Sequence, residues 1–473
     1  MKSELLKFGV AGLTAAGTLF AQCKAQAQLP EHPNIVLIIT DQQQAGKLSW
    51  YGDTQLSTPT MDRLASQGVN FCNSYSTFPL SIPQRFALFT GMYPSSINLR
   101  FNPTSTKDKE TIDFEEEDRL RGLMLGEVFH RAGYDTFYGG KAHLLSPYGN
   151  EDTEYFGFRH NYSPERRNLL GADAAELLSH KTPKDRPFLM VVSYINPHDI
   201  CEYDDYVDLP HMTKSRKTKH EGLSRVARYI NETTYKWSPE EFYSSIAPPL
   251  PDNFPIMEGM PEGTPGKISA YTDEQWRMHR WVYDRLIEEV DADIAPVVKA
   301  LEDGGFMDNT FIVFMSDHGD MDASHHMEHK TAPFEESQKV PFIICGPGIR
   351  KGAIESSTVN TGIDLLPTLC DLAGIDIPDI YPGLSLKDLA TGERDSLARK
   401  YIFCESSGWN QVIEDGRYKL TVLDAERGGQ VILTDLKEDP GELRNLAEDP
   451  SYKDIVDRLK RILSEELSSR HRR

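Results

Sequence analysis

The chain has 473 residues, enough for about two to four domains, and its composition of 39% hydrophobic, 10% aromatic and 26% charged residues is typical of a globular protein. These values argue against a disordered chain, a collagen and a multi-span membrane protein. The 51 Lys and Arg residues against 72 Asp and Glu residues give a formal net charge of −21, which argues against non-specific nucleic-acid binding. An anionic substrate would therefore need a local positive site, such as a bound metal ion.

The first 27 residues are typical of a signal peptide. Lys2 and Lys7 precede an apolar stretch over residues 8–21, which is followed by a small-x-small pattern ending at Ala27. The stretch is too short to span a bilayer, so no stable membrane insertion is expected. We therefore predict an exported protein, periplasmic or on the outer surface, that is cleaved near Ala27. Two alternatives are a frayed N-terminal helix and a lipoprotein attached through Cys23.

Three continuous apolar runs predict buried parallel strands. They cover residues 34–40, 188–195 and 310–315. Polar side chains follow each run, over residues 41–44, 196–199 and 316–320. Because open α/β sheets bind ligands at the carboxyl ends of their strands, these polar clusters predict one shared site at a sheet edge. The expected fold class is α/β, with a large, mostly parallel sheet sandwiched by helices.

The main domain is expected over residues 28–397, with a long helix over residues 276–301. Within this domain, residues 199–270 are rich in Pro, Tyr and charge and predict an irregular insertion. The insertion either lines a cleft or is a long surface loop. Its aromatic residues either stack on a sugar or pack against the main domain. These aromatic residues are Tyr235, Trp237, Phe242 and Tyr243.

A smaller C-terminal subdomain is expected over residues 398–473. Short β-rich runs predict antiparallel strands, followed by an amphipathic helix over residues 452–467. The strands are expected around residues 401–404, 411–413, 418–422 and 431–434. The result is a small α+β unit packed on the main domain.

A serine motif lies between the first two predicted strands. Ser81 is followed by Pro83, Arg85 and the pair Thr90-Gly91. A serine before a proline is usually only a helix cap. The whole motif, however, resembles the signature of the sulfatases, in the alkaline-phosphatase superfamily, and in particular the Ser-type among bacterial exported carbohydrate sulfatases. This resemblance implies an alkaline-phosphatase-like fold and oxidation of residue 81 to formylglycine (3-oxoalanine), whose hydrated aldehyde is the nucleophile.

The resemblance extends over nearly the whole mature chain. Residues 34–42 resemble the family's first strand with its acidic metal-binding end, and residues 132–143 resemble its glycine-rich stretch ending in Lys-x-His. Residues 316–320, with Lys330 downstream, resemble its second metal-binding stretch and its catalytic lysine. Each piece alone is weak, but their order and joint occurrence predict a sulfatase catalytic domain over residues 28–397.

The resemblance also implies a hard divalent cation held by oxygen-rich ligands. The ligands are expected to be Asp41, Gln42, Ser81 as formylglycine, Asp317 and His318. Calcium (Ca2+) is expected. Mn2+ or Mg2+ are alternatives, because the pair of Gln42 and His318 is nearer the ligand set of choline-sulfatase-like and phosphonate-monoesterase-like members. Such a cation neutralises sulfate oxygens and helps to deprotonate the residue-81 diol.

The other expected site residues surround the sulfate ester. The resemblance implies that Arg85 holds the residue-81 diol. It also implies that Lys141 and Lys330 bind sulfate oxygens, with Lys330 near the leaving oxygen. His143 is the candidate base that breaks the covalent sulfo-enzyme hemiacetal. His198 contacts the substrate and is the candidate acid for the departing alcohol.

Three histidines lie close together around Glu328. They are His325, His326 and His329. Their spacing differs from the helical His-x-x-x-His pattern of zinc sites. The favoured interpretation is a substrate-facing loop, in which His325 binds the substrate.

The expected function is hydrolysis of sulfate monoesters, on O-sulfated sugars of glycosaminoglycans or other sulfated polysaccharide fragments. The expected partners are this sulfated carbohydrate and, transiently, a formylglycine-generating maturase. A serine at position 81 implies an anaerobic-type radical maturase, or an engineered Cys→Ser change; an unmodified serine lacks the diol. Two alternatives are a phosphonate monoester or phosphodiester hydrolase with the same site, and a catalytically silent carbohydrate-binding protein.

Overall fold

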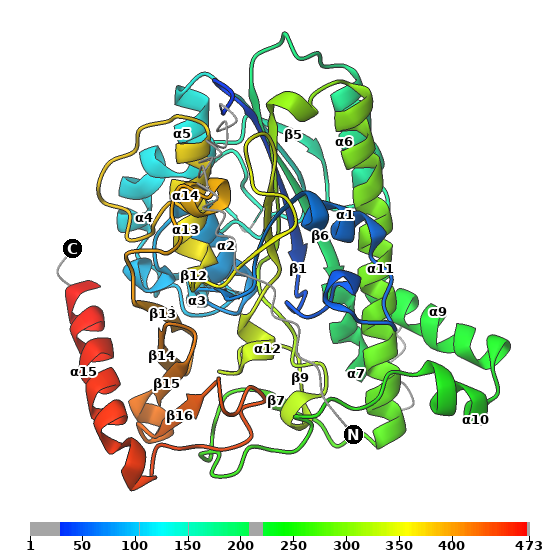
Figure 1. Cartoon of the computed structure of the whole chain (residues 1–473), viewed down its shortest axis with the longest axis vertical. Helices are drawn as coiled ribbons and strands as arrows, with labels where there is room; N and C mark the ends of the chain where they lie inside the picture. The colour runs from blue at the N-terminus through cyan, green and yellow to red at the C-terminus, as the bar shows by residue number, and fades with distance from the viewer. Residues whose placement is uncertain (1–28, 104, 150, 208–220, 471–473) are drawn as a thin grey trace, which may run out of the picture.

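An eight-stranded sheet runs through the centre of the protein, with the strand order β11-β2-β10-β8-β1-β6-β4-β5 (Figure 1). The structure, a computed structural model, describes residues 29–103, 105–149, 151–207 and 221–470. The strands of the sheet are β1 (Asn34–Asp41), β2 (Gly68–Phe71), β4 (Asp135–Gly140), β5 (His160–Ser163), β6 (Phe188–Pro197), β8 (Thr310–Ser316), β10 (Phe342–Cys345) and β11 (Ala353–Glu355). β10 is antiparallel to β8 and β2, and the other pairings in the sheet are parallel. This arrangement confirms the predicted mostly parallel sheet.

β1 lies at the centre of this sheet, between β6 and β8. All eight of its residues are buried. Because successive side chains of a strand point to opposite faces, Ile35 and Leu37 join the hydrophobic core on one face, while Val36 and Ile38 join the core on the other. Two covered faces explain why the run is apolar without alternation.

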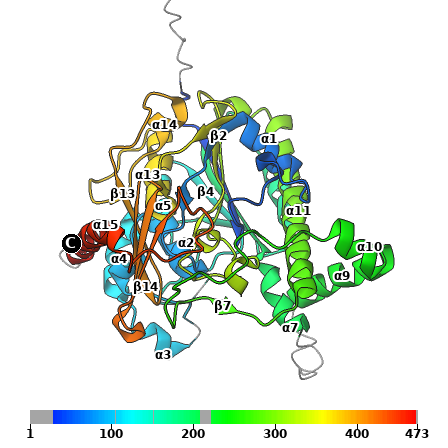
Figure 2. The same ribbon diagram turned by 60° about the horizontal axis from the view of Figure 1, so that its bottom comes forward.

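Helices cover both faces of the sheet, so the main domain has three layers (Figure 2). One face packs against α1 (Pro59–Gln67), α6 (Leu170–Ser179) and α11 (Asp273–Asp303). The other face packs against α2 (Ser81–Thr90), α5 (Leu125–Arg131) and α13 (Thr361–Leu372). The long helix α11 begins at a capping box formed by Thr272 and Gln275, three residues before the predicted start. Shorter elements of this part are α3 (Thr106–Lys109), α4 (Phe114–Leu120), α12 (Glu335–Gln338), α14 (Lys387–Thr391), and the paired strands β3 (Ser74–Tyr75) with β12 (Val359–Asn360) and β7 (Lys267–Ile268) with β9 (Met327–Glu328).

The C-terminal unit is an antiparallel sheet covered by one helix, as the sequence predicts. Its elements are β13 (Tyr401–Glu405), β14 (Trp409–Glu414), β15 (Tyr418–Leu423), β16 (Val431–Asp435) and α15 (Lys453–Arg470). α15 packs Leu459 and Leu463 onto Val412, Leu420 and Leu433 of the sheet. Each strand therefore has an apolar face toward α15.

Glu405, at the end of β13, joins the C-terminal unit to the main domain. Its Oε1 accepts a hydrogen bond from the backbone N–H of Ser95 (2.8 Å), and its Oε2 accepts one from Arg470 (2.9 Å). The Arg470 guanidinium also lies 3.3 Å from the centre of the Tyr93 ring. The end of α15 is therefore attached to the segment that follows α2.

The insertion differs from the expected irregular segment, because its first half is helical where it is described. It contains α7 (Tyr203–Val207), the amphipathic α9 (Glu221–Lys236) and the short α10 (Pro239–Glu241). Apolar residues at helical spacing inside α9 pack on α11, a signal hidden by the charged residues between them. Of the four aromatic side chains, Trp237 and Phe242 pack against Trp281, Tyr243 packs against Phe242, and Tyr235 is 88% exposed. For three of the four, packing against the main domain is thus the correct alternative.

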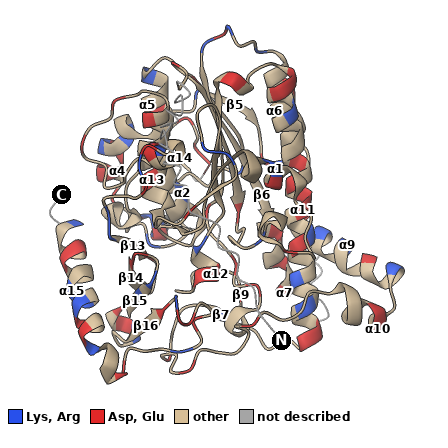
Figure 3. Ribbon diagram, in the orientation of Figure 1, with Lys and Arg blue, Asp and Glu red and all other residues tan. Residues whose placement is uncertain are grey.

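Acidic and basic residues are mixed along α11 and α15 (Figure 3). In the described ranges, no helix is both long enough and apolar enough to cross a bilayer. The expected signal peptide, residues 1–27, lies outside the described residues. Any attraction of an anion to a chain with a net charge of −21 therefore has to come from a local cluster of cations.

Glu117, on α4, is a carboxyl group whose loss of hydration on burial is not offset by hydrogen bonds to the described residues. It is 0% exposed, and neither carboxyl oxygen has a hydrogen-bond partner in the described part of the chain. Burial, with a contribution from Asp118, raises its pKa to about 8. The folded protein therefore keeps a proton that the unfolded chain releases above its ordinary pKa of 4.5.

We predict that Glu117→Gln stabilises the protein, and that the gain grows as the pH rises from 4.5 to 8. The folded pKa is raised, so the wild-type penalty is absent below pH 4.5 and complete above pH 8. At about 1.4 kcal/mol per pH unit, the gain reaches up to about 3 kcal/mol at pH 7. The measurement is the Tm difference between variant and wild type at pH 5 and pH 8. Glu115→Gln, at an exposed position of the same helix, is the control. If the Tm difference between Glu117→Gln and wild type were the same at pH 5 and pH 8, the raised pKa of Glu117 would be wrong.

Candidate active site and metal centre

The three polar clusters predicted at strand ends lie together. β1 pairs in parallel with both β6 and β8, and its last residue, Asp41, is opposite Pro197. Asp317 directly follows β8, and His198 directly follows β6. The carboxyl ends of three adjacent parallel strands therefore bring these side chains to one edge, as expected.

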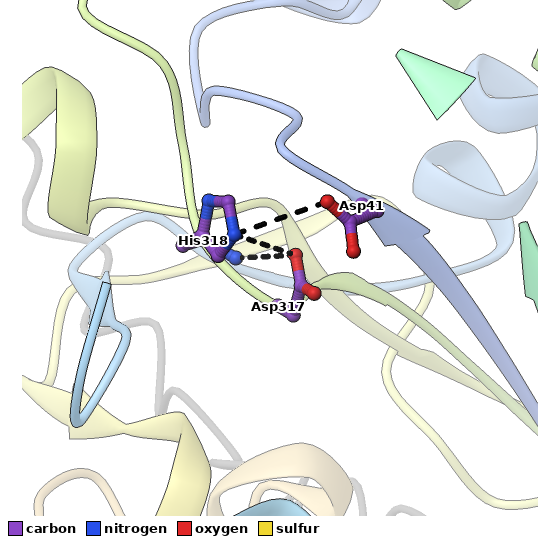
Figure 4. A group of neighbouring side chains, drawn as sticks. All are labelled: Asp41, Asp317 and His318. Carbon is purple, nitrogen blue, oxygen red and sulfur yellow. Dashed lines mark hydrogen bonds and ion pairs between the residues drawn. The ribbon is translucent and has the colours of Figure 1, made fainter. Parts of the chain in front are cut away.

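Asp41, Asp317 and His318 form a group that could bind a metal ion (Figure 4). One candidate ligand atom from each residue lies within 4.8 Å of the others. His318 Nε2 lies 3.9 Å from Asp41 Oδ1 and 3.7 Å from Asp317 Oδ1. Asp41 Oδ1 is buried and has no hydrogen-bond partner among the described residues. An orphaned carboxylate oxygen beside a second carboxylate fits a bound cation.

The imidazole of His318 presents a lone pair to this group. Its Nδ1 lies 3.0 Å from the carbonyl oxygen of Gly319, so Nδ1 carries the proton and donates this hydrogen bond. Burial, reinforced by Lys330, lowers the pKa of His318 well below its ordinary value. The ring is therefore neutral, and Nε2 is free to act as an acceptor or a metal ligand.

Ser81 faces the same atoms from the start of α2. Its Oγ lies 3.2 Å from His318 Nε2, and the residue is 1% exposed. It is the first residue of the helix, where the positive end of the helix dipole favours an anion. The motif serine and the predicted metal ligands thus meet in one place.

Arg85 bridges the two carboxylates instead of holding residue 81. Its Nε donates to Asp317 Oδ2 (3.0 Å), and its Nη2 donates to Asp41 Oδ2 (3.1 Å). Its Nη1 donates to Ser193 Oγ and to the carbonyl oxygen of Lys141. Two buried carboxylates attract a guanidinium more strongly than a neutral serine hydroxyl does. The expected contact of Arg85 with the residue-81 diol stays a prediction.

The two predicted lysines approach the cluster from different loops. Lys141, after β4, places Nζ 2.7 Å from Asp41 Oδ2. Lys330 donates from Nζ to Gln42 Oε1 at 2.5 Å. Gln42 therefore lies in the site with its amide oxygen toward a cationic group, as a candidate ligand should. Its role as a metal ligand stays a prediction.

The charges around the carboxylates separate their pKa values. Burial alone would raise the pKa of Asp41, but the positive charges of Lys141 and Arg85 hold it well below the ordinary value. Burial and the negative charge of Asp41 raise the pKa of Asp317 to about 7. A bound cation would remove the repulsion that raises the second pKa, because both carboxylates would face it.

The two histidines expected to move protons are neutral in this structure. Burial, followed by Lys141 and Lys330, lowers the pKa of His198 well below its ordinary value. Burial and Lys141 lower the pKa of His143 to about 3. The backbone N–H of His143 donates to Glu151 Oε2 (3.1 Å), which fixes the start of its turn.

The residues that hold the turn of His198 are not evident from the sequence. The carboxylate of Asp199 accepts two hydrogen bonds from Arg167 (2.9 and 2.8 Å) and lies 3.3 Å from Nε of Arg225 in α9. α9 approaches closely here, since a Cβ on Gly222 would lie 2.7 Å from Asp199 Oδ1. The only available signal was an acidic residue beside a histidine, which gave no hint of partners 32 and 26 residues away.

His325 is not exposed to a substrate in this structure. Its ring is buried and stacks on Phe334, with a distance of 4.1 Å between ring centres. The expected contact of His325 with a substrate stays a prediction, and in this structure its ring packs on Phe334 instead. Nearby, Asp204, Glu328 and His329 form a second acidic group. The amine of Lys267 contacts both carboxylates and already compensates their charge.

Comparisons with known proteins agree with this geometry. The family model "Sulfatase" matches residues 33–375, and the model "N-sulphoglucosamine sulphohydrolase, C-terminal" matches residues 324–469. The chain is 30% identical to Delta 4,5-hexuronate-2-O-sulfatase of Bacteroides thetaiotaomicron, over 95% of this chain and 91% of that protein. It is 28% identical to arylsulfatase of Clostridium perfringens, over 93% of this chain and 95% of that protein.

Solved structures give the same result for the fold. A 2-O GAG sulfatase superposes with a TM-score of 0.75 at 28% identity, with 93% of each chain covered. Phosphonate monoester hydrolase of Agrobacterium radiobacter superposes with a TM-score of 0.64, over 93% of this chain and 95% of the other. The 23% identity of the second pair supports a shared fold alone.

We predict that chelation with EDTA lowers the Tm and that added Ca2+ restores it. A cation that binds only the folded protein stabilises it by about 2.7 kcal/mol at a hundredfold excess over Kd. Asp317→Asn should abolish the Ca2+-dependent Tm shift, because it removes one of the two carboxylate ligands. The control is Asp173→Asn on α6, where Asp173 forms an ion pair with Arg166, and this variant should keep the Ca2+-dependent Tm shift. The metal assignment fails if the chelated wild type shows the same Tm with and without Ca2+.

Proposed function

This chain belongs to the sulfatase family of sulfuric ester hydrolases, and we propose that its substrates are 2-O-sulfated hexuronates in glycosaminoglycan fragments. Two relatives support this substrate class: the Bacteroides protein named for Delta 4,5-hexuronate 2-O-sulfate, and the solved structure of a 2-O GAG sulfatase. Such a substrate carries a carboxylate and a sulfate. The local cations Lys141 and Lys330, with the bound metal ion, would attract it despite the acidic surface.

The observation that carries the proposal is the position of Ser81 against the carboxylate cluster. The Ser81 Oγ, His318 Nε2 and the Oδ1 atoms of Asp41 and Asp317 converge at the end of the helix that begins at residue 81. A nucleophile, a metal-binding group and a helix N-terminus are the three elements needed to attack and stabilise an anionic ester.

Formylglycine at residue 81 and a Ca2+ ion complete the proposed site, supplying a diol nucleophile and charge neutralisation of the sulfate oxygens. The ion would be held by Asp41, Gln42, Asp317, His318 and residue 81. The family generally uses formylglycine and a divalent metal ion. The choice of Ca2+ rests on the oxygen-rich donor set. Ser81 donates its hydroxyl proton toward His318 Nε2 in the unmodified chain, so the same nitrogen orients the side chain before modification.

Lys141 and Lys330 would bind sulfate oxygens as positive charges. Lys141 already lies against Asp41, so its Nζ is oriented toward the cluster before substrate arrives. Lys330 is oriented in the same way by Gln42. Preoriented charges lose little conformational entropy on binding, which favours the transition state.

His198 is the proposed acid for the leaving alcohol. The lysines that lower its pKa are the same groups that a bound sulfate would neutralise. Arrival of the anion would therefore raise the pKa of His198 and allow the imidazole to hold a proton for the leaving oxygen. His143, on the opposite loop, would take a proton from residue 81 in the second half of the reaction.

We predict that His198→Ala lowers the rate on sugar sulfates by about 10²–10⁴-fold and affects nitrophenyl sulfate far less. A nitrophenolate leaves without protonation, whereas a sugar alkoxide needs an acid. The measurement is kcat/KM on both substrate types, with His130→Ala, exposed on α5, as the control. Equal losses on both substrates would assign His198 to binding only.

Export and maturation are part of the proposal. A periplasmic or surface location, after cleavage near Ala27, would bring the enzyme to incoming polysaccharide fragments. Oxidation of Ser81 would require a maturase that accepts serine, with which the chain associates transiently. A chain that escaped maturation would keep the binding site and lack the diol.

We predict that co-expression with a Ser-type maturase raises sulfate release from unsaturated 2-O-sulfated uronate disaccharides by orders of magnitude. Mass spectrometry of the residue-81 peptide should show a loss of about two hydrogens in the active preparation. Disaccharides sulfated only at a glucosamine 6-O position are the substrate control and should remain intact. Equal turnover with residue 81 unmodified would disprove the formylglycine mechanism. No turnover by fully modified protein on any sulfated disaccharide would favour a silent carbohydrate-binding protein.

A further inference from the structure

Gln42 is held at each of its four polar atoms. Its backbone N–H donates to Asp317 Oδ1 (3.1 Å), and its carbonyl oxygen accepts from the Tyr283 hydroxyl (2.6 Å). Its side-chain Nε2 donates to Asp320 Oδ2 (2.6 Å), and its Oε1 accepts from Lys330 (2.5 Å). The residue is completely buried. A surface turn would not need four such contacts, so the orientation of this one side chain is closely controlled.

The backbone of Gln42 adopts a conformation that glutamine rarely takes. Its φ is 74°, in the left-handed region that favours glycine. Tyr283, on α11, contacts both sides of this turn, because its hydroxyl donates to the Gln42 carbonyl and accepts from the N–H of Gln44 (3.0 Å). The hydroxyl thus offsets a backbone cost of order 1 kcal/mol and fixes where the side chain begins.

Asp320 decides which end of the amide faces the cluster. A carboxylate only accepts hydrogen bonds, so the NH2 group of Gln42 has to point toward Asp320. The amide oxygen then points the other way, toward the amine of Lys330. Cys201 cannot make this choice, since its sulfur lies 3.2 Å from Nε2 and 3.3 Å from Oε1. Asp320 is itself fixed by the N–H of Asp322, which donates to its Oδ1 (2.8 Å).

We propose that Tyr283 and Asp320 are positioning residues that present Gln42 Oε1 to the cation as a neutral oxygen ligand. This inference rests on the metal site of the proposed function. The amide oxygen has two lone pairs, so it can accept from Lys330 and still face a cation. A reversed amide would direct its NH2 group at the cation and would weaken binding. The loss of either contact should therefore appear first in the affinity for the ion.

The test is calorimetric Ca2+ titration of the full chain after chelation, using Tyr283→Phe, Asp320→Ala and Asp320→Asn. Removal of an outer partner of a metal ligand typically costs 10–100-fold in affinity. We expect Tyr283→Phe and Asp320→Ala each to raise the Kd by at least tenfold. Asp320→Asn should lose less, because its amide oxygen can still accept from Gln42 Nε2. Tyr194→Phe, which removes a buried hydroxyl bonded to the carbonyl of Asp293, is the matched control and should bind as the wild type does.

The outcomes separate this inference from the proposed function. If the wild type binds no Ca2+, Mn2+ or Mg2+, the metal site of the proposed function is wrong. If the wild type binds and both Tyr283→Phe and Asp320→Ala keep its Kd within twofold, the positioning role is wrong. A purely structural role would lower the Tm of the chelated variants and leave the Kd and the ion-induced Tm shift unchanged, which also overturns the inference. If Asp320→Ala does not fold, the isosteric Tyr283→Phe decides.

Discussion

The contact of Arg85 with Asp41 and Asp317 is the interaction on which the rest of the site depends. Two buried carboxylates at adjacent strand ends would repel each other strongly in a medium of low dielectric constant. The guanidinium takes the Oδ2 atom of each, and this leaves both Oδ1 atoms facing His318. Because Arg85 and Ser81 lie one turn apart on α2, the same ion pairs fix where the helix begins and where the nucleophile points.

The position of α2 depends in turn on parts of the chain that are distant in sequence. α13 approaches it closely at Gly362, where a Cβ would lie 2.2 Å from Thr77 Oγ1 and 2.8 Å from the Ala87 side chain. Thr77 also bonds to Asn360, and β3 pairs with β12 just before α2 begins. On the far side, Glu405 and Arg470 hold the segment after the helix. Packing and hydrogen bonds at both ends of α2 therefore make the position of Ser81 depend on the C-terminal unit as well as on the main domain.

The sequence predicts those features that depend on local pattern. The runs at residues 34–40, 188–195 and 310–315 became β1, β6 and β8 because a strand covered on both faces has to be apolar throughout. The parallel order of these strands then explains why Asp41 and Asp317 meet. Features set by partners far along the chain were not predictable: the carboxylate contacts of Arg85, the burial of His325, and the docking of α9 at Asp199. In each case the charged group or ring could contact several different partners, and only the packed fold determines which partner lies close to it.

The enclosure of Ser81 has a consequence for the order of events during biosynthesis. The imidazole that contacts its hydroxyl belongs to His318, which the ribosome adds long after Ser81 has emerged. In the folded chain the serine is 1% exposed. An enzyme that oxidises this residue must therefore act on the growing or still unfolded chain. Rapid folding around α2 would compete with the proposed modification, so the yield of modified protein would depend on folding speed as well as on the amount of that enzyme.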